Sequence, residues 1–328
     1  MPPIRHHRPS TSGRIPRIAC VVGPTASGKT ALGIRLAKQL NGEIINADAR
    51  QCFTDFSIGT GKPPGERGLF EGRRAFVVHG VPHYLMDFLP PSQVYTVAEW
   101  RTAAMHAIKG ITRRHRLPVV VGGTGLYVKS LVDNFAFPRV EPKPHLRSAF
   151  EAKSLEELVA HLLKLDPAAA EVVDLKNPRR VIRAIEIVTF TGKPMRETRK
   201  IGKPVVEAFQ VGIKWNRHDL NARIDHEIEH MIERGWIDEI REIIRKGVPL
   251  DAPAMTSIGY RELVSYIKGE KALEQAIAAC KLAVHRYAKR QETWYRRDPR
   301  IHWAHSEDDA VAMVGEWVAK EKERPISS

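Results

Sequence analysis

The residues with the clearest chemical potential are Gly23, Gly28, Lys29 and Thr30, which follow an apolar run and open a periodic apolar segment. They fit the pattern G-x-x-x-x-G-K-T, in which glycines allow backbone N–H groups to close around phosphate oxygens. The N-terminus of the following helix adds a positive dipole, the lysine adds a charge, and the threonine hydroxyl suits Mg²⁺. This pattern predicts a P-loop for a di- or triphosphate and leaves the compound open.

Two more polar residues follow apolar runs, Asp48 after 43–47 and Thr124 after 117–123. Because ligands of open α/β sheets bind beyond the carboxyl ends of strands, we expect both residues to share one crevice with the P-loop. A diphosphate, a carboxylate and a hydroxyl facing each other suit alkyl transfer from a diphosphate ester to a nucleophile that loses a proton. The run 117–123 ends in glycines instead of a Walker B acid, which disfavours an ATPase or kinase.

These residues need a scaffold, and four β-branched apolar runs are typical of buried parallel strands. The runs span 17–23, 43–48, 117–123 and 210–215. Helical patterns lie between them, which predicts an α/β fold: a P-loop NTPase-like core with a parallel sheet flanked by helices. Two long helices are expected after the last strand, over 219–246 and 271–297.

The segment from 139 to 207 has a different character and predicts an inserted helical domain. Ser154 with Glu157 forms a capping box, and Asp166 and Asn177 each precede a proline at a first helical position. Gly192 is expected to close the last of these helices. The remaining expected parts are a basic tail (1–16), the core (17–138 and 208–305) and a C-terminal helix and tail (306–328).

The chain is basic, with 52 Lys and Arg against 38 Asp and Glu in 328 residues, a net charge of +14. Such an excess suits nucleic acid or an anionic membrane, with a merely solvated basic surface as the alternative. No apolar run reaches the roughly 18 residues of a membrane span, so we expect no membrane association. Cys20, Cys52 and Cys280 form no CxxC pair, which predicts neither a zinc site nor disulfides and favours the reducing cytoplasm.

A series of motifs stands in the order seen in bacterial tRNA dimethylallyltransferases (isopentenyl-tRNA transferases), and the chain resembles this family over 17–304. The motifs are "GPTASGKT", "NADARQ", "IGTGKP", "VPHYLMD", "VGGTGLY", "NPRRVIRAIE", "SIGYRELVSYIKGE" and "YAKRQETWYRR". The resemblance implies transfer of a dimethylallyl group from dimethylallyl diphosphate to N6 of adenine 37 of tRNA, 3′ of the anticodon. We expect a monomer.

The resemblance also implies roles for single residues. The P-loop would bind the isoprenoid diphosphate, with Mg²⁺ on Thr30; its residues are Gly23, Pro24, Thr25, Ala26, Ser27, Gly28, Lys29 and Thr30. Asp48 would be the general base on the adenine N6–H, and Thr124 would hydrogen-bond the adenine or the bridging oxygen. Arg223 would bind the diphosphate. We expect it in the first turn of a helix, where the helix dipole disfavours a cation. A residue placed against such a local preference often has a functional role.

The implied contacts to the anticodon stem-loop come from several segments: Asp48, Ala49, Arg50, Gln51, Thr124, Arg147, Arg179, Arg180 and Arg183. A cationic stripe, Lys281, His285 and Lys289 with Arg286 and Arg290 beside it, is a further candidate for following a phosphate backbone or else a solvated helix face. Aromatic candidates for stacking on a flipped adenine, or for wedging beside it, are Tyr127, Tyr260, Trp294 and Tyr295, although core packing is favoured for each of them taken alone.

Three residues depart from the family pattern: Ala49 stands in place of a serine, Phe53 of a tyrosine and Gly61 of an alanine. The lost serine hydroxyl predicts a weaker contact to RNA or diphosphate. Three alternatives stay open. A small-molecule adenylate isopentenyltransferase would accept AMP, a P-loop ATPase or kinase would use the γ-phosphate of ATP, and an RNA-binding protein without transfer would bind tRNA in a salt-dependent manner.

Overall fold

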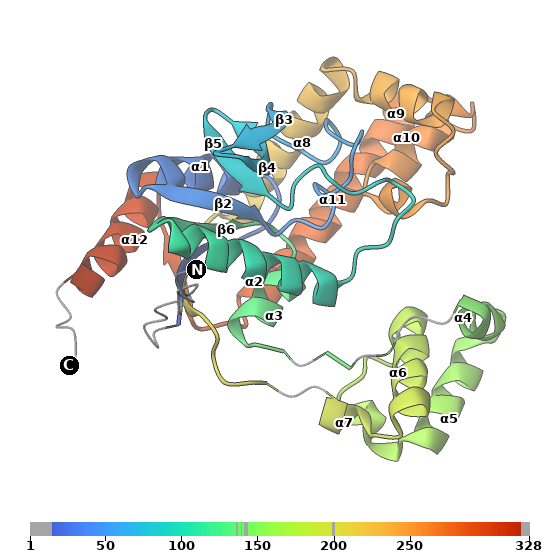
Figure 1. The fold of residues 1–328 in the computed structure, drawn as a ribbon. Helices are drawn as coiled ribbons and strands as arrows, with labels where there is room; N and C mark the ends of the chain where they lie inside the picture. The colour runs from blue at the N-terminus through green and yellow to red at the C-terminus, as the bar shows by residue number, and fades with distance from the viewer. Residues whose placement is uncertain (1–14, 136, 139, 141–143, 199–200, 323–328) are drawn as a thin grey trace, which may run out of the picture. The chain divides into compact units, whose positions relative to one another are not determined.

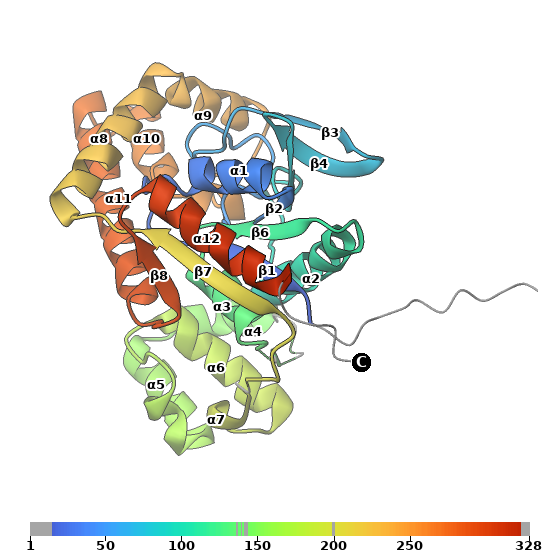
Figure 2. The ribbon, with the colours of Figure 1, turned by 90° about the vertical axis from the view of Figure 1, so that its left-hand side faces the viewer.

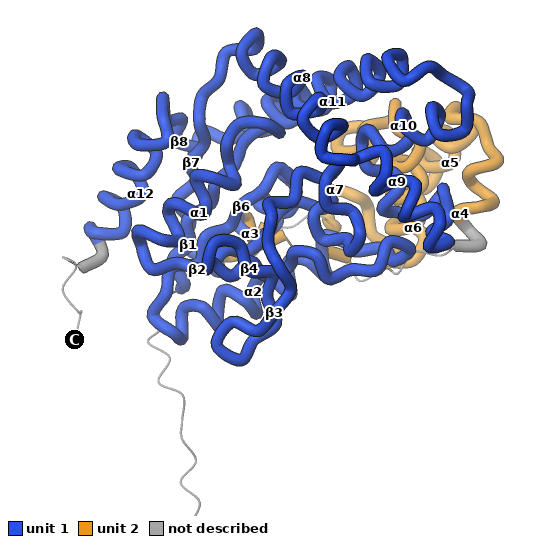
Figure 3. The backbone as a smooth tube through the Cα atoms, turned by 90° about the horizontal axis from the view of Figure 1, so that it is seen from above, with its two compact units in different colours: residues 1–132, 205–328 blue, residues 133–204 orange. Residues whose placement is uncertain are grey.

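The computed structural model describes residues 15–135, 137–138, 140, 144–198 and 201–322. The chain divides into two compact units, one made of 1–132 with 205–328 and the other of Asp133–Pro204. In the sequence the second unit is thus an insertion between two segments of the first, and Figure 3 colours the two units blue and orange. Its bounds lie a few residues before the expected 139–207.

The first unit is built on one eight-stranded sheet with the order β3-β4-β5-β2-β6-β1-β7-β8. The strands are β1 (Arg17–Val21), β2 (Gly42–Asn46), β3 (Glu66–Phe70), β4 (Arg73–Val78), β5 (Val81–Tyr84), β6 (Leu117–Val121), β7 (Glu207–Ile213) and β8 (Ile301–Ala304). From β5 to β8 all neighbours are parallel, whereas β3 and β4 add an antiparallel edge. The α/β class is therefore confirmed, and the four predicted strands are the central β2, β6, β1 and β7.

Helices cover both faces of this sheet (Figure 1 and Figure 2). The helices of the first unit are α1 (Lys29–Gln39), α2 (Val97–Arg113), α3 (Gly125–Val132), α8 (Arg217–Glu233), α9 (Trp236–Arg245), α10 (Tyr260–Ile267), α11 (Leu273–Tyr295) and α12 (Glu307–Lys322), with the short 3-10 helix η2 (Pro253–Thr256). Apolar side chains of α1 and α12 pack on one face of the sheet, and those of α2 and α3 on the other. A third core joins α8, α9, α10 and α11.

The single helix expected over 219–246 is wrong, because the chain forms α8 and α9 with a break at Gly235. Gly235 has φ 91°, a left-handed backbone that ends one helix and precedes the next. The break turns the following Trp236 into the core, where it is 1% exposed. The helix expected over 271–297 is confirmed as α11.

The second unit is helical, with α4 (Pro144–Glu151), α5 (Leu155–Leu165), η1 (Pro167–Glu171), α6 (Pro178–Thr191) and α7 (Met195–Thr198). The capping residues act as predicted: Ser154 Oγ accepts from Glu157 N at 3.2 Å, and Asn177 Oδ1 accepts from Arg180 N at 3.3 Å. Asp166 caps the 3-10 helix η1 instead of an α-helix. Gly192 ends α6 with φ 63°.

The three cysteines are buried free thiols. Among the described residues, the helices are too short or too polar to cross a membrane.

His83 in β5 is a buried histidine that the sequence motifs left without a role. It is 2% exposed, its Nδ1 lies 3.0 Å from Val81 O, and burial lowers its pKa from 6.5 to about 4. The folded state therefore resists a proton that the unfolded chain accepts below about pH 6.5. Above that pH the imidazole is neutral in both states and the unfolding free energy keeps its full value. As the pH falls towards 4, protonation of His83 in the unfolded chain lowers the unfolding free energy.

We expect that, between pH 7 and pH 4.5, the wild type loses about 2–3 kcal/mol more unfolding free energy than His83→Gln does. Urea unfolding at a series of pH values measures this difference. His106→Gln, at an exposed histidine of α2, is the control and should keep the wild-type slope. Parallel curves for wild type and His83→Gln would contradict a neutral buried His83.

Candidate active site

The P-loop joins β1 to α1 and leaves its backbone facing a groove of about 1280 Å³. Gly28 has φ 86° and directly precedes α1, a conformation that strains any side-chain-bearing residue. Lys29 opens α1, and its amino group donates to Pro24 O. Burial lowers the pKa of Lys29 to about 8, which the Asp48 carboxylate partly offsets. The loop therefore holds a poorly solvated amino group whose protonated form a bound anion would stabilise.

The groove brings together residues that the sequence predicted separately. It is lined by the P-loop residues Thr25, Ala26, Ser27, Gly28, Lys29 and Thr30, and by Asp48, Gln51, Lys62 and Arg223. A carboxylate at the end of β2 and an arginine of α8 thus face the same space as the loop. Gly23 and Pro24 shape the start of the loop behind this lining.

Arg223 is held over the P-loop by an aromatic neighbour. Its Nε donates to Ala26 O at 3.0 Å, and its guanidinium lies 4.5 Å from the centre of the Trp215 ring. Trp215 Nε1 in turn donates to Ser27 O at 3.2 Å. Because α8 begins at Arg217, Arg223 lies in the second turn, so the predicted first-turn position is wrong. Stacking on Trp215 explains its placement instead.

Backbone hydrogen bonds tie Asp48 and Thr124 together across the ends of β2 and β6. Thr124 N donates to Ala47 O at 3.1 Å, and Thr124 Oγ1 accepts from Ala49 N at 3.0 Å. Asp48 Oδ1 accepts from Arg50 N at 2.8 Å, which fixes the carboxylate in an Asx-turn. The Thr124 hydroxyl keeps its own hydrogen available for donation because its oxygen acts here as the acceptor.

The departures from the family pattern affect this arrangement little. Residue 49 binds Thr124 through its backbone N–H, a contact that alanine makes as well as serine. Phe53 is 4% exposed and packs in the core of α8 to α11, where a ring without a hydroxyl leaves no polar group to be satisfied. Gly61 has φ 62°, and its carbonyl accepts from Gln51 Nε2 at 3.0 Å.

Gln51 lines the groove, and Arg50 precedes it in the sequence. Arg50 Nη1 donates to Pro253 O at 3.1 Å and to Thr256 Oγ1 at 3.0 Å. Gln51 Nε2 also donates to Thr60 O at 3.2 Å. Both side chains connect the segment after β2 to other loops of the first unit.

In the second unit the four predicted RNA-binding arginines fall into two pairs. Arg147 and Arg183 both bind Glu186, at 2.7 Å and 2.9 Å, and the Glu186 side chain is fully buried. Arg179 is exposed, and Arg180 is exposed beside Asp174 at 3.0 Å. The first pair therefore stabilises the unit, whereas the second pair stands on the surface of α6.

The cationic stripe predicted on α11 is interrupted. Lys281 binds Glu229 at 2.5 Å and His285 lies 2.8 Å from Asp225, so both face α8. Lys289, with Arg286 and Arg290, is exposed. Tyr127, Tyr260 and Tyr295 are buried in cores, which confirms for these three the core packing favoured over stacking, whereas Trp294 is 39% exposed.

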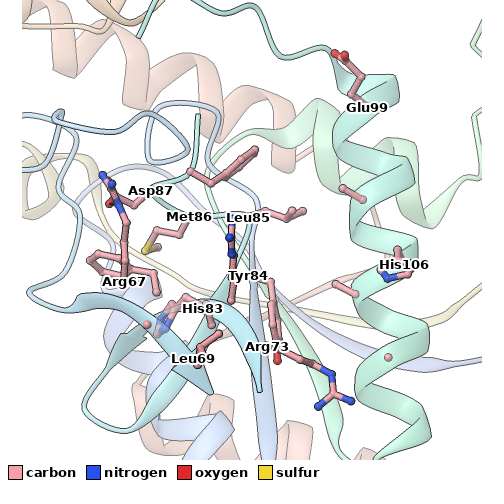
Figure 4. A pocket seen from close by; sticks show the side chains of 18 of the residues that line it. Arg67, Leu69, Arg73, His83, Tyr84, Leu85, Met86, Asp87, Glu99 and His106 are labelled. Atoms are coloured by element: carbon pink, nitrogen blue, oxygen red, sulfur yellow. Dashed lines mark hydrogen bonds and ion pairs between the residues drawn. The ribbon is translucent and has the colours of Figure 1, made fainter. Parts of the chain in front are cut away.

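A second groove of about 1440 Å³ lies between α2 and the strands β3, β4 and β5 (Figure 4). Two of its lining arginines are paired with carboxylates, Arg67 with Asp87 and Arg114 with Glu43. Its floor includes the apolar Leu85 and Met86. The groove lacks the phosphate-binding backbone of the P-loop, so the P-loop groove is the candidate active site.

Comparisons with known proteins find relatives that match almost the whole chain. The family described as IPP transferase matches residues 51–298, and the family described as isopentenyl transferase matches 16–81. The tRNA dimethylallyltransferase of Roseiflexus sp. (strain RS-1) is 39% identical over 93% of this chain and 99% of that protein. That of Corynebacterium diphtheriae is 38% identical over 90% and 95%.

Two solved structures resemble the fold. The tRNA isopentenylpyrophosphate transferase of Bacillus halodurans has a TM-score of 0.67 and 34% identity, covering 94% of this chain and 97% of that one. A eukaryotic dimethylallyltransferase acting on tRNA has a TM-score of 0.78 and 27% identity, covering 95% and 81%. With a P-loop that shares its groove with a carboxylate, and with relatives matched nearly end to end, this chain belongs to the tRNA dimethylallyltransferase family.

Proposed function

We propose that this protein transfers a dimethylallyl group from dimethylallyl diphosphate to N6 of adenine 37 of tRNA, 3′ of the anticodon. The observation that carries the proposal is that Asp48 lines the same groove as the P-loop. A phosphate-binding loop and a proton acceptor that face one space are what alkyl transfer from a diphosphate to an amine requires.

In the proposed reaction the adenine N6 lone pair attacks C1 of the dimethylallyl group. The N6–C1 bond forms, the C1–O bond breaks, and the diphosphate leaves with that electron pair. Exocyclic amines of adenine are poor nucleophiles because the ring delocalises the lone pair, so removal of the N6 proton by Asp48 makes the step feasible. The Thr124 hydroxyl, which accepts from Ala49 N, donates its hydrogen to the adenine or to the bridging oxygen.

Negative charge grows on the departing diphosphate, and three groups of this chain stabilise it. They are the backbone N–H groups of the P-loop, the Lys29 ammonium and the Arg223 guanidinium. Arg223 is already stacked on Trp215 beside Ala26, so little ordering is needed when the diphosphate binds.

We propose that Mg²⁺ accompanies the diphosphate, with the Thr30 hydroxyl as its side-chain ligand. The donor fits such an ion, because Thr30 lines the groove next to Lys29 and a hydroxyl oxygen is a ligand that Mg²⁺ accepts. Diphosphate oxygens and water would supply the other ligands, as is usual for Mg²⁺. A bound ion neutralises part of the leaving-group charge.

The anticodon stem-loop is the proposed RNA partner, with Arg179 and Arg180 of α6 and Lys289 of α11 as phosphate contacts. All three side chains are exposed. The target adenine flips out of its stack to reach Asp48. We propose that the protein acts as a monomer in the cytoplasm, a compartment in which its three cysteines would stay free thiols.

Arg180→Glu is expected to weaken tRNA affinity about tenfold and to lower the slope of log affinity against log salt by about 1–2. Diphosphate affinity should stay unchanged, because Arg180 belongs to the second unit and the P-loop to the first. Filter binding at several salt concentrations and calorimetry with inorganic diphosphate measure the two affinities.

The matched control for this variant is Arg196→Glu in α7 of the same unit. Arg196 is also exposed and also paired with a carboxylate, Glu171. Its charge reversal should leave tRNA affinity within about twofold. An equal loss in both variants, or a parallel loss of diphosphate affinity, would contradict the role given to Arg180.

The proposed function is tested with labelled dimethylallyl diphosphate, Mg²⁺ and three acceptors: unmodified tRNA, the same tRNA with guanine at position 37, and AMP. We expect label in the first acceptor alone. Label in AMP would make the protein a small-molecule isopentenyltransferase. Binding of tRNA without label in any acceptor would make it an RNA-binding protein.

A further inference from the structure

The motif "YAKRQETWYRR" contains a buried residue to which the mechanism so far gives no role, Gln291 of α11. Gln291 is 5% exposed. Its Oε1 accepts from Thr25 N at 2.9 Å, and its Nε2 donates to Gly123 O at 2.9 Å. One side-chain amide therefore joins the P-loop to the turn after β6.

Both partners of Gln291 belong to loops that hold a substrate. Thr25 is part of the P-loop, and Gly123 immediately precedes Thr124, which is bound to the backbone next to Asp48. A Cβ at residue 123 would lie 2.4 Å from Gln291 Nε2 and 3.7 Å from Asp48 Oδ2. The glycine thus admits the amide to a position close to the proposed base.

Tyr295 lies one helical turn further along α11 and braces the same turn. It is 3% exposed, and its hydroxyl donates to Gly122 O at 3.3 Å. Gln291 therefore contacts both substrate loops, whereas Tyr295 contacts only the turn at 122–124. This difference separates a link between the loops from mere support of one of them.

We propose that Gln291 is a positioning residue that sets the separation between the diphosphate site and the acceptor site. This inference rests on the proposed function, in which the adenine N6 must reach C1 of a group whose diphosphate lies on the P-loop. A reaction between two bound substrates depends steeply on their distance and alignment, so the two loops must be held relative to each other.

A glutamine suits this position for a chemical reason. One end of the side chain has to accept from an N–H and the other end has to donate to a carbonyl, and the amide does both. A glutamate keeps the acceptor and loses the donor. A methionine of similar length loses both and leaves the Thr25 N–H and the Gly123 carbonyl unpaired.

The test compares the full-length wild type with Gln291→Met, Gln291→Glu, Tyr295→Phe and Thr293→Ala. Thr293 is an exposed residue of α11 whose hydroxyl bonds its own helix, so its variant is the matched control. Gln291→Met should lower kcat about 10–100-fold with tRNA affinity within about twofold, and Tyr295→Phe should lower kcat less. Thr293→Ala should match the wild type.

Amide hydrogen exchange gives a readout that does not depend on catalysis. Gln291→Met should speed exchange at both 23–28 and 122–124, whereas Gln291→Glu and Tyr295→Phe should speed it only at 122–124. The inference would be overturned if Gln291→Met matched the wild type in kcat and in exchange at both segments. It would also be overturned if Gln291→Met sped exchange along the whole chain while Gln291→Glu matched the wild type at 122–124.

Failure of the proposed function looks different. In that case the wild type would transfer nothing to tRNA, while the exchange pattern of the variants would still report the link between the loops.

Discussion

Asp48→Asn is expected to lower kcat for dimethylallyl transfer about 10²–10⁴-fold, the range by which a positioned general base accelerates proton removal. The asparagine keeps an oxygen for the bond from Arg50 N, so the turn after β2 should hold its shape. It cannot take the N6 proton. Affinities for tRNA and for inorganic diphosphate should therefore stay within about threefold of the wild type. Single-turnover transfer and two binding titrations measure these quantities.

The control for this variant is Asp55→Asn, which removes a carboxylate of the same segment that binds Lys246 at the surface. Its kcat should equal that of the wild type. Full activity in Asp48→Asn would remove Asp48 as the base. A matching loss of tRNA affinity would assign Asp48 to RNA binding instead.

Lys29→Met is expected to lower kcat/KM for dimethylallyl diphosphate about 10²–10³-fold. This is the usual cost of removing one preorganised group that faces the charge developing in the transition state. Methionine keeps the length of the side chain and removes the charge. Because burial holds the pKa of Lys29 near 8 in the free protein, an arriving diphosphate gains more from this ammonium than from a fully solvated one. Steady-state kinetics measure kcat/KM, and calorimetry with inorganic diphosphate measures the affinity for the diphosphate.

Lys38→Met is the matched control for that prediction. Lys38 is an exposed lysine of the same helix and lines the same groove, two turns beyond the P-loop. Its loss should change kcat/KM by less than about threefold. Equal losses in both variants would mean that the groove attracts diphosphate by its general charge and not through the P-loop.

The central strands could be predicted from the sequence because both of their faces are buried. β2, β6, β1 and β7 each carry buried apolar residues, whereas β3 is almost wholly exposed and carries no apolar pattern. The break at Gly235 was missed because the apolar stripe of α8 continues in register into α9. A single glycine there gives little signal until its φ of 91° is seen.

The candidate site was only partly predictable. The P-loop and Asp48 stand at ends of strands, so spacing alone places them. Trp215 and Gln291 gave no such signal, because their partners are backbone groups of Ser27 and Thr25 that lie far away in the sequence. The pairing of Arg147 and Arg183 with Glu186 likewise depends on tertiary packing, since nothing in the sequence brings Arg147 beside α6.

We propose that the P-loop uses an isoprenoid diphosphate and not ATP. The most direct test is to incubate the wild type, unmodified tRNA and Mg²⁺ with either labelled dimethylallyl diphosphate or γ-labelled ATP. Product in RNA and released phosphate are then measured. We predict one diphosphate released for each dimethylallyl group on adenine 37, with no γ-phosphate released or transferred. Hydrolysis or transfer of the γ-phosphate, with no alkylated adenine, would contradict the account.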